Sequence, residues 1–500
     1  MQGEFSILRP DGNGYDAEET ATFYQDLNLL QVIDRLSGKW GREIRKYFMY
    51  LPEDPKEGDY RRAVYGDIKK EPVYRALMAF TEAMNGVDKL RGERTRVSDS
   101  LQRSAWLIRE AEAYCGAYVA LHRELSQAEL ESEGMLSLLA ILTETMDGGY
   151  REIHKLTAEA LTEIRKMRFV VTYEKARMRV EIRETPGEGA YDKWLNSEAQ
   201  SEDVTFVNPF LTDAAITELE RACLTILKEK NKDFFRRIQT AAKQCERYQK
   251  TVLLRFEQEV LYYLSYATLQ KEMEKAGHHF ATPATGDGVR MEAKGLYDIA
   301  LAIATLSDGR KVIANDFYYG PGERFFVLTG PNQGGKTTFA RSLGQLVYLT
   351  RMGLDVPAES ASVPYFSNIQ THFSVEESVE TGRGKLMDEL VRLAPMMAGN
   401  ESETFVVINE LFTTAANYDA QIMGKRVLEH FISRGCTGIY VTHLKELAED
   451  RDGVVSLRAM LNDRGIQTFE IRRGEAEDSA CAANQVNKYR LSYEQLKERL

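Results

Sequence analysis

The feature that most constrains the fold is a glycine-rich segment between an apolar stretch and a helix-like stretch. Residues Gly330-Pro-Asn-Gln-Gly-Gly-Lys336-Thr337 fit the spacing G-x-x-x-x-G-K-[ST], and the buried-strand pattern of Arg324–Thr329 precedes them. Glycines let backbone N–H groups turn toward a phosphate chain, and the N-terminus of the following helix favours an anion. The sequence therefore predicts a nucleotide-binding loop in an α/β domain with a largely parallel sheet.

Side chains in and after this loop have the chemistry needed for phosphate and metal. Lys336 would reach the β- and γ-phosphates, and Thr337 would ligate Mg²⁺. Downstream, the apolar run Phe405–Ile408 leads into Asn409-Glu410, where such a strand normally ends in Asp-Glu. Glu410 is well placed to orient or deprotonate an attacking water. Asn409 can hold a metal-bound water but adds no Coulombic attraction, so we expect weaker Mg²⁺ affinity and slow turnover.

A histidine follows a third apolar run. Gly438–Thr442 has the buried-strand pattern, and His443 comes directly after it. A histidine at the carboxyl end of a strand in such a sheet lies at the crevice where ligands bind, and it can sense a γ-phosphate there. Taken together, these motifs predict an ATPase that uses ATP and Mg²⁺.

The pattern of expected helices and strands divides the chain into three parts. Residues 1–100 are mostly helical, and residues 101–276 are again helical and rich in Leu, Ala, Glu and Arg. Over 277–500, strands and helices alternate, and a short helical segment ends the chain. We expect the long helical pattern from about Thr212 to about Ala276 to be broken, because helices of that length are rare.

A small β-containing insert interrupts the second part at about 167–210. Phe169–Tyr173 and Met178–Ile182 have the pattern of short strands, so a long helix out, this insert and a long helix back form an arm with a tip. Seven basic residues against two acidic ones lie between Arg165 and Arg183. Such a patch can neutralise phosphates without reading sequence. The candidate DNA-binding residues are Arg168, Lys175, Arg177, Arg179 and Arg183. The alternative interpretation of these basic residues is that the arm does not bind DNA and that its long exposed helices simply carry alternating charges.

Composition excludes several other classes of protein. The net charge of −11 argues against a generic polyanion-binding surface, so any nucleic-acid contact must come from local basic patches. The longest apolar run, eight residues from Met135 to Leu142, is far short of the roughly 20 residues of a membrane span. The N-terminus has no apolar signal core, and the five cysteines are scattered. We expect a cytoplasmic protein with free thiols and no structural metal.

The motifs, in this order, resemble the MutS ATPases of DNA mismatch repair and their paralogues. Thr329–Thr338 has the form G-P-N-x-G-G-K-[ST]-T, which is far more specific than the general phosphate loop. The other matching segments are Ile313–Asn315, Val356–Ala358, Ile369–His372, Asn409-Glu410, Tyr418-Asp419 and Thr442-His443. The resemblance is strong over about 290–480 and architectural over 20–275.

The resemblance implies a multidomain fold. An all-α core and long lever helices with a small β-containing, clamp-like tip would precede an ABC-type P-loop ATPase domain. It implies that nucleotide is held by Gly330, Pro331, Asn332, Gln333, Gly334, Gly335, Lys336, Thr337 and Thr338. Thr337 and, through water, Asn409 would bind Mg²⁺, Glu410 would be the catalytic base, and His443 would be the sensor. It also implies a homodimer in which Gly382, Arg383 and Gly384 approach the partner's nucleotide.

The chain departs from the family pattern in several places. Gly384-Lys385 stands where Ser-Thr is usual, Leu411–Asn417 replaces a Gly-rich loop, and Val312 stands where an aromatic residue often stacks on adenine. Only about 20 residues precede the core, so we expect a paralogue without the mismatch-recognition and connector domains. Phe80-Thr-Glu82 lies in a helical stretch and is not expected to act as a mismatch wedge.

Two functions of different classes stay open at the level of the sequence. The first is a dimeric, ATP-gated clamp that closes two arms around duplex or branched DNA, without sequence preference, in repair or recombination at the nucleoid. The second is a nucleotide-switched scaffold that acts on a protein or ribosomal partner with little hydrolysis. Salt-sensitive DNA binding with DNA-stimulated turnover would favour the clamp.

Overall fold

The chain forms two compact units. The structure is a computed structural model that describes residues 5–12, 21–174, 177–184, 204–207, 218–246, 248–286, 288–374, 384–399, 402–449, 451–462, 464–475 and 497. One unit, here the P-loop unit, comprises Leu8–Tyr65 and Leu261–Leu500. The other, here the arm unit, comprises Gly66–Val260 and a short N-terminal stretch that ends at Ile7. None of the described helices is both long and apolar enough to cross a membrane.

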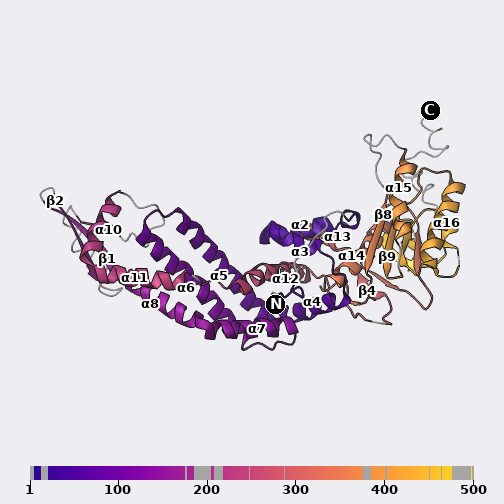
Figure 1. The fold of residues 1–500 in the computed structure, drawn as a ribbon. Coiled ribbons are helices and arrows are strands. Elements are labelled where there is room, and N and C mark those ends of the chain that lie inside the picture. Colours follow the sequence, from indigo (N-terminus) through magenta and orange to yellow (C-terminus); the bar gives the residue numbers. More distant parts are fainter. Residues whose placement is uncertain are drawn as a thin grey trace. The chain divides into compact units, whose positions relative to one another are not determined.

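A six-stranded sheet is the centre of the P-loop unit (Figure 1). Its order is β12 (Gln467–Arg473), β11 (Val454–Leu461), β6 (Phe325–Thr329), β10 (Thr437–Val441), β9 (Thr404–Asn409) and β8 (Asn368–Phe373). The five strands from β11 to β8 are parallel, and β12 pairs antiparallel with β11 at the edge. Every residue of β6 and β10 is buried, which is the burial expected of parallel strands covered on both faces.

Helices cover the two faces of this sheet. α14 (Lys336–Arg351) packs against β8, β9 and β10. On the other face, α15 (Lys385–Ala398) and α16 (Asn417–Ser433) form an apolar core with the strands, to which Leu393, Val406 and Phe431 belong (Figure 1). The sequence-based prediction of an α/β domain with a largely parallel sheet is confirmed.

A second, smaller sheet lies in the same unit. β4 (Glu292–Leu296) pairs antiparallel with both β5 (Asn315–Tyr318) and β7 (Ser360–Ser362). The short helix α13 (Ile299–Thr305) follows β4, and the Asp298 carboxylate accepts the Leu301 N–H at its N-terminus. That carboxylate satisfies one of the helix's free donors. The second sheet and α13 thus bring residues 292–318 next to the start of α14.

The N-terminal helices of the P-loop unit are α1 (Phe23–Asp26), α2 (Leu29–Trp40) and α3 (Arg45–Met49), and side chains of α14 bind the backbone at the ends of α1 and α3. Four of these side chains donate to backbone carbonyl oxygens of residues 26–52. The pairs are Arg341 Nε to Asp26 (2.9 Å), Gln345 Nε2 to Leu27 (2.9 Å), Tyr348 Oη to Phe48 (2.7 Å) and Arg351 to Pro52. Spacings of four and three residues place these donors along one side of the helix.

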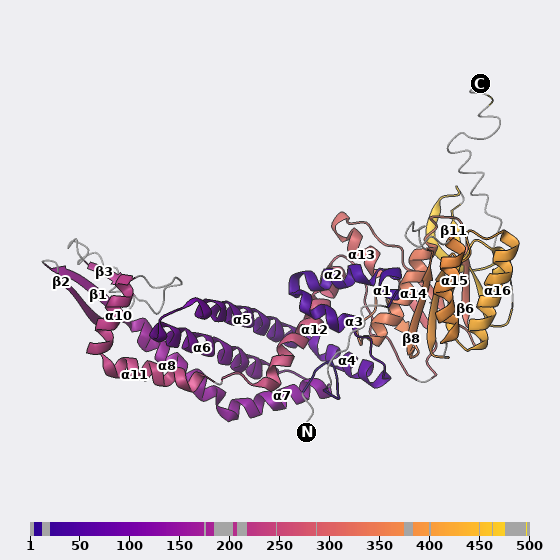
Figure 2. The ribbon, with the colours of Figure 1, turned by 45° about the horizontal axis from the view of Figure 1, so that its top comes forward.

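The arm unit is helical with a β tip (Figure 2). Its helices are α5 (Glu71–Arg96), α6 (Ser100–Leu125), α7 (Glu133–Thr145), α8 (Arg151–Lys166), α10 (Glu218–Lys230) and α11 (Lys232–Cys245), with the ends of α4 (Pro55–Ile68) and α12 (Thr251–Lys275). α5, α6, α8 and α11 lie side by side. Asp99 caps α6 by accepting the N–H groups of Leu101 and Gln102.

At the tip, β1 (Met167–Glu174) pairs antiparallel with both β2 (Arg177–Glu184) and β3 (Val204–Val207). The two short strands predicted from the sequence lie inside β1 and β2, so that prediction is confirmed. The predicted break in the returning helix is also found, because α10, α11 and α12 are separate helices. The proposed start near Thr212 lies outside the described residues, as does all of the C-terminal helical segment except residue 497.

The break between α11 and α12 changes which side chains face inward. Tyr248 lies in the gap between these two helices and is buried, whereas Val252 near the start of α12 is 38% exposed. A break in the helix resets the rotation of the side chains about its axis, so residues on either side of it no longer share a face.

Candidate functional site: a glycine-rich loop and its cavity

The glycine-rich loop connects β6 to α14 and has backbone angles that its glycines allow. Gly330 (φ 132°), Gln333 (φ 63°) and Gly335 (φ 84°) all have positive φ values. A Cβ on Gly330 would lie 3.0 Å from the Cβ of Ala459 on β11, so a larger residue there would push β11 away. The loop leads directly into the N-terminus of α14, and the positive end of a helix attracts an anion.

Lys336 is the first residue of α14, and its side chain turns back into the loop. Its Nζ donates to the carbonyl oxygens of Gly330 (2.8 Å) and Pro331 (2.9 Å), and the residue is only 4% exposed. A positive charge is therefore held within the loop rather than in bulk solvent. That is the place at which a lysine of this motif pairs with phosphate oxygens.

Thr337 and Asn409 meet at the carboxyl end of β9. The Thr337 hydroxyl donates to Asn409 Oδ1 over 2.9 Å, so two neutral oxygen atoms of the kind that Mg²⁺ prefers lie together. Glu410 follows at once with φ 55°, and its N–H donates to Val441 O on β10 (2.9 Å). The predicted metal-binding pair and the predicted base thus lie next to one another at one end of the sheet.

A cavity of about 560 Å³ lies beside the loop, a volume in the range of small-ligand sites. Seven of the nine predicted loop residues, from Asn332 to Thr338, line it, and so does Glu410. Its other walls come from α13, from residues 310–315 that lead into β5, and from β12. Their apolar side chains include Leu301, Val312, Ile313 and Phe469, and Arg310 and Lys311 add positive charge. The cavity therefore combines a polar end at the loop with an apolar wall, as a nucleotide requires for its phosphates and its base.

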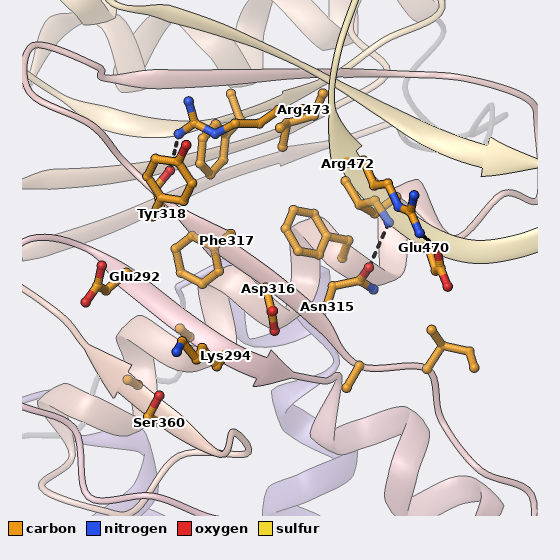
Figure 3. Close-up of a pocket in the computed structure, with 18 of the residues that line it drawn as sticks. Glu292, Lys294, Asn315, Asp316, Phe317, Tyr318, Ser360, Glu470, Arg472 and Arg473 are labelled. Carbon is orange, nitrogen blue, oxygen red and sulfur yellow. Dashed lines mark hydrogen bonds and ion pairs between the residues drawn. The ribbon is translucent and has the colours of Figure 1, made fainter.

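Strand β12 contributes residues that the sequence motifs did not identify. Phe469 (φ 61°) packs over the loop, since a Cβ on Gly335 would lie 3.3 Å from its ring. Asn315 on β5 holds this strand: its Nδ2 donates to Phe469 O (3.2 Å), and its Oδ1 accepts the Ile471 N–H (2.7 Å; Figure 3). The family resemblance pointed to Asn315 but gave it no role. Nothing in the sequence around Phe469 marks it.

Comparisons with known proteins agree with this geometry. Residues 326–479 match the family model described as MutS domain V. The chain resembles the MutS family over this region, which supports its membership of that family. It is 32% identical over 209 residues to DNA mismatch repair protein MSH6 of Arabidopsis thaliana, a match that covers 41% of this chain and 16% of that protein. It is 31% identical over 137 residues to DNA mismatch repair protein MutS of Thermotoga maritima, which covers 27% of this chain and 17% of that one.

A longer match covers more of this chain. The protein of the same name from Solibacter usitatus is 27% identical over 277 residues, which are 54% of this chain and 31% of that protein. The chain thus spans less than a third of the length of these curated relatives. The matched region includes the glycine-rich loop, Asn409, Glu410 and His443.

His443 lies close to the sheet but outside the cavity lining of this MutS domain V. It follows Thr442, whose N–H donates to Leu328 O (3.1 Å), and its own side chain is exposed. Of the predicted partner-facing residues, Gly382 and Arg383 lie outside the described part of the chain, and Gly384 immediately precedes α15. The assignments of these residues stay predictions.

The predicted DNA-binding arginines belong to the β tip of the arm unit. Lys175 lies outside the described residues. The register pairs Arg168 with Arg183, Thr172 with Arg179 and Glu174 with Arg177. Since strand residues alternate between faces, the positions of the four arginines share one face of the hairpin, opposite to the buried Val180.

A second cavity of about 740 Å³ adjoins the first (Figure 3). It lies between β4, β5, β7 and β12, and Asn315 contributes to both cavities. Arg473 stacks on Tyr318 at its rim (3.8 Å from the guanidinium carbon to the ring centroid) and pairs with Glu323 (2.7 Å). Within the described residues, no group of three or more His, Cys, Asp or Glu side chains could hold a metal ion.

Proposed function

We propose that this MutS family chain binds and hydrolyses ATP with Mg²⁺. The observation that supports this most directly is the meeting of Lys336, the Thr337–Asn409 pair and Glu410 at one end of the parallel sheet, beside a cavity large enough for a nucleotide. The relatives are named DNA mismatch repair proteins, and the match is to the domain that contains this site.

Each residue has a role that follows from its chemistry. The backbone N–H groups of Gly330 and of residues 332–338 would bind the phosphate chain, and Lys336 would neutralise its charge. Thr337 and Asn409 would hold Mg²⁺, which when bound supplies positive charge to the β- and γ-phosphate oxygens. Glu410 would orient and deprotonate the attacking water, and His443 would report the presence of the γ-phosphate.

Two substitutions separate nucleotide binding from hydrolysis. Lys336→Ala should abolish ATP binding, because it removes the charge held within the loop. Glu410→Gln should keep binding and lose turnover by about a hundredfold or more, because an amide cannot accept the proton of water. Equilibrium binding of labelled ATP and phosphate release measure the two properties. Lys425→Ala on the exposed side of α16 is the control that should change neither. Full activity of both site variants would refute the ATPase proposal.

We further propose that the protein is a homodimeric, nucleotide-gated clamp on DNA, active in repair or recombination in the cytoplasm. The proposal includes a helical core, lever helices and a clamp-like tip as its working parts. The shared face of Arg168, Arg177, Arg179 and Arg183 supports contact with phosphates, and such contacts carry no sequence preference.

Binding to DNA is tested with charge reversal at the tip. Arg177→Glu with Arg179→Glu should weaken binding to duplex and branched DNA by about tenfold or more and reduce the salt dependence, while basal ATP turnover stays unchanged. The matched control reverses two exposed arginines of α5, Arg75 and Arg96. If both pairs of substitutions weaken binding equally, the tip is not the DNA-binding surface.

The neutral Asn409 is also compatible with a second function, because slow hydrolysis is expected from it. A nucleotide-switched scaffold on a protein or ribosomal partner needs ATP binding but little hydrolysis. Turnover that does not respond to DNA of any shape, together with binding to ribosomes that depends on ATP, would favour the scaffold over the clamp.

A further inference from the structure

Glu389 is a buried acid of α15 that none of the motifs involves. It lies in the second turn of the helix and is 2% exposed. Its Oε2 accepts the backbone N–H of Phe412 over 3.0 Å. Its Oε1 is buried and has no hydrogen-bond partner among the described residues. Glu389 does not line the nucleotide cavity, so a direct contact with nucleotide does not explain it.

The loop that Glu389 holds is the one that begins at the proposed catalytic base. Glu410 (φ 55°) and Phe412 (φ 63°) both have left-handed backbone conformations without being glycine. Such residues cost free energy and persist only where surrounding contacts hold them. Two hydrogen bonds do so here: Glu410 N–H to Val441 O (2.9 Å) on one side and Phe412 N–H to Glu389 on the other. Loss of either bond would let the backbone at Glu410 relax.

A contribution to the stability of the fold does not by itself explain why position 389 has a carboxylate. The neighbours of Glu389 belong to an apolar core that includes Leu393, Leu411 and Tyr440, and burial raises the pKa of the Glu389 carboxyl. An apolar side chain of similar size would avoid the cost of burying this group. The acceptor for the Phe412 N–H is what such a side chain could not supply.

We infer that Glu389 is a positioning residue for Glu410, and that it ties the place of the base to helix α15. The inference rests on the proposed ATPase function and deepens it. A displacement of α15 would therefore reach Glu410 through Glu389 and the Phe412 N–H.

The test compares two substitutions of Glu389 in the full-length chain. Glu389→Met removes the acceptor at nearly constant volume and should lower kcat by at least about tenfold, with little change in the ATP dissociation constant. Glu389→Gln keeps an oxygen that can accept the Phe412 N–H and should restore most of kcat. A loss of kcat without a loss of ATP binding is not expected from a merely structural residue.

Leu393→Ala is the matched control on the same helix. Leu393 is 3% exposed and packs in the same core, so this change loosens α15 without removing the acceptor. It should lower the midpoint of thermal unfolding and leave kcat unchanged below that midpoint. Wild-type kcat in Glu389→Met, or equal losses of kcat in Glu389→Met and Leu393→Ala, would overturn the inference.

Amide hydrogen exchange tests the same contact without turnover. Exchange at residues 410–415 should be faster by about tenfold in Glu389→Met than in the wild-type protein, and nearly normal in Glu389→Gln. If the wild-type protein releases no phosphate at all, the proposed function fails, and this measurement then decides the inference by itself. Equal exchange in all three proteins would overturn it.

Discussion

Asn409 places a neutral amide where a strand of this kind usually presents a carboxylate. Its Oδ1 accepts the Thr337 hydroxyl, so it still takes part in the geometry of the site. What it lacks is charge. A full negative charge close to a divalent cation adds a Coulombic attraction that an amide dipole cannot match. The structure therefore keeps the arrangement expected of a metal-binding pair with a weaker electrostatic contribution.

The Asn409→Asp variant should bind Mg²⁺ more tightly and turn over faster. We expect the Mg²⁺ concentration at half-maximal ATP turnover to fall by about tenfold, because a carboxylate at this position attracts the cation directly. A titration of turnover against Mg²⁺ measures this. Asn417→Asp, the same change at the exposed start of α16, is the control. Superimposable Mg²⁺ curves for wild type and Asn409→Asp would show that charge at this position is unimportant.

Phe469 offers the aromatic surface that Val312 does not. Both residues line the cavity, but only Phe469 has a ring, and it lies 45% exposed beside Gly335. Stacking of a base on an aromatic side chain contributes about 1–3 kcal/mol. Phe469→Ala should therefore raise the ATP dissociation constant by about tenfold, while Phe469→Tyr should not. Calorimetric titration with ATP measures both, and an unchanged affinity in Phe469→Ala would place the base elsewhere.

The sequence predicts those residues of the site that lie in one short segment, and it does not predict those that distant segments bring together. Lys336 and Thr337 belong to one contiguous motif, and Asn409 and Glu410 end an apolar strand, so their positions follow from short-range pattern. Phe469, Asn315 and Glu389 reach the site only through the pairing of distant elements. Asn315 binds residues of β12 that lie more than 150 positions away in sequence. No periodicity or spacing in the sequence records such a contact.

At the scale of elements, α14 links the nucleotide loop to the N-terminal helices. It starts at Lys336 in the loop, and its side chains from Arg341 to Arg351 donate to carbonyl oxygens between Asp26 and Pro52. Backbone carbonyls lack the conformational freedom of side chains, so a displacement of α14 would be passed on to those helices. The helices themselves were predictable from their apolar spacing, but this set of contacts was not, because it joins residues about 300 positions apart.

In the arm unit, two tyrosines of α6 bind one partly buried acid of α12. Tyr114 and Tyr118 donate to Glu257 Oε1 at 2.7 and 2.8 Å, and burial raises the pKa of the Glu257 carboxyl. In the unfolded chain the pKa of a glutamate is about 4.3. Between that value and the higher pKa of the folded state, the folded protein binds more protons than the unfolded chain. Stability therefore falls as pH rises through this window and stays lower above it.

Glu257→Gln should remove this pH dependence. Both tyrosines donate to Oε1, so the amide oxygen of glutamine can still accept both hydrogen bonds, while the partly buried charge is gone. The variant should be at least as stable as the wild type at pH 7 and should show a smaller decrease in its unfolding midpoint as pH rises from 4.5. Thermal unfolding of the whole protein across pH measures this, with Glu144→Gln at an exposed position of α7 as the control. A lower midpoint for Glu257→Gln at every pH would show that the charge stabilises the fold.

At the scale of the whole molecule, the P-loop unit presents apolar side chains that nothing in the described part of this chain covers. On α15, Met387, Leu390 and Val391 are 53, 39 and 45% exposed. The neighbouring α16 exposes Tyr418 and Ile422 at 72 and 38%. Exposed apolar side chains gathered on adjoining helices are typical of protein interfaces. They support the proposed homodimer, because α15 is also the helix that follows the predicted partner-facing segment.

Leu390→Glu should prevent dimer formation without preventing ATP binding. A charge in the middle of an apolar interface would have to be buried without a partner, which we expect to weaken dimerisation by at least about tenfold. Sedimentation at a series of protein concentrations, with ATP and the Glu410→Gln substitution to slow hydrolysis, measures the dimer. Leu136→Glu makes the same change at a 48% exposed leucine of α7 and should leave the dimer intact. Equal dimerisation of both variants would assign this apolar surface to a partner other than a second copy of the chain.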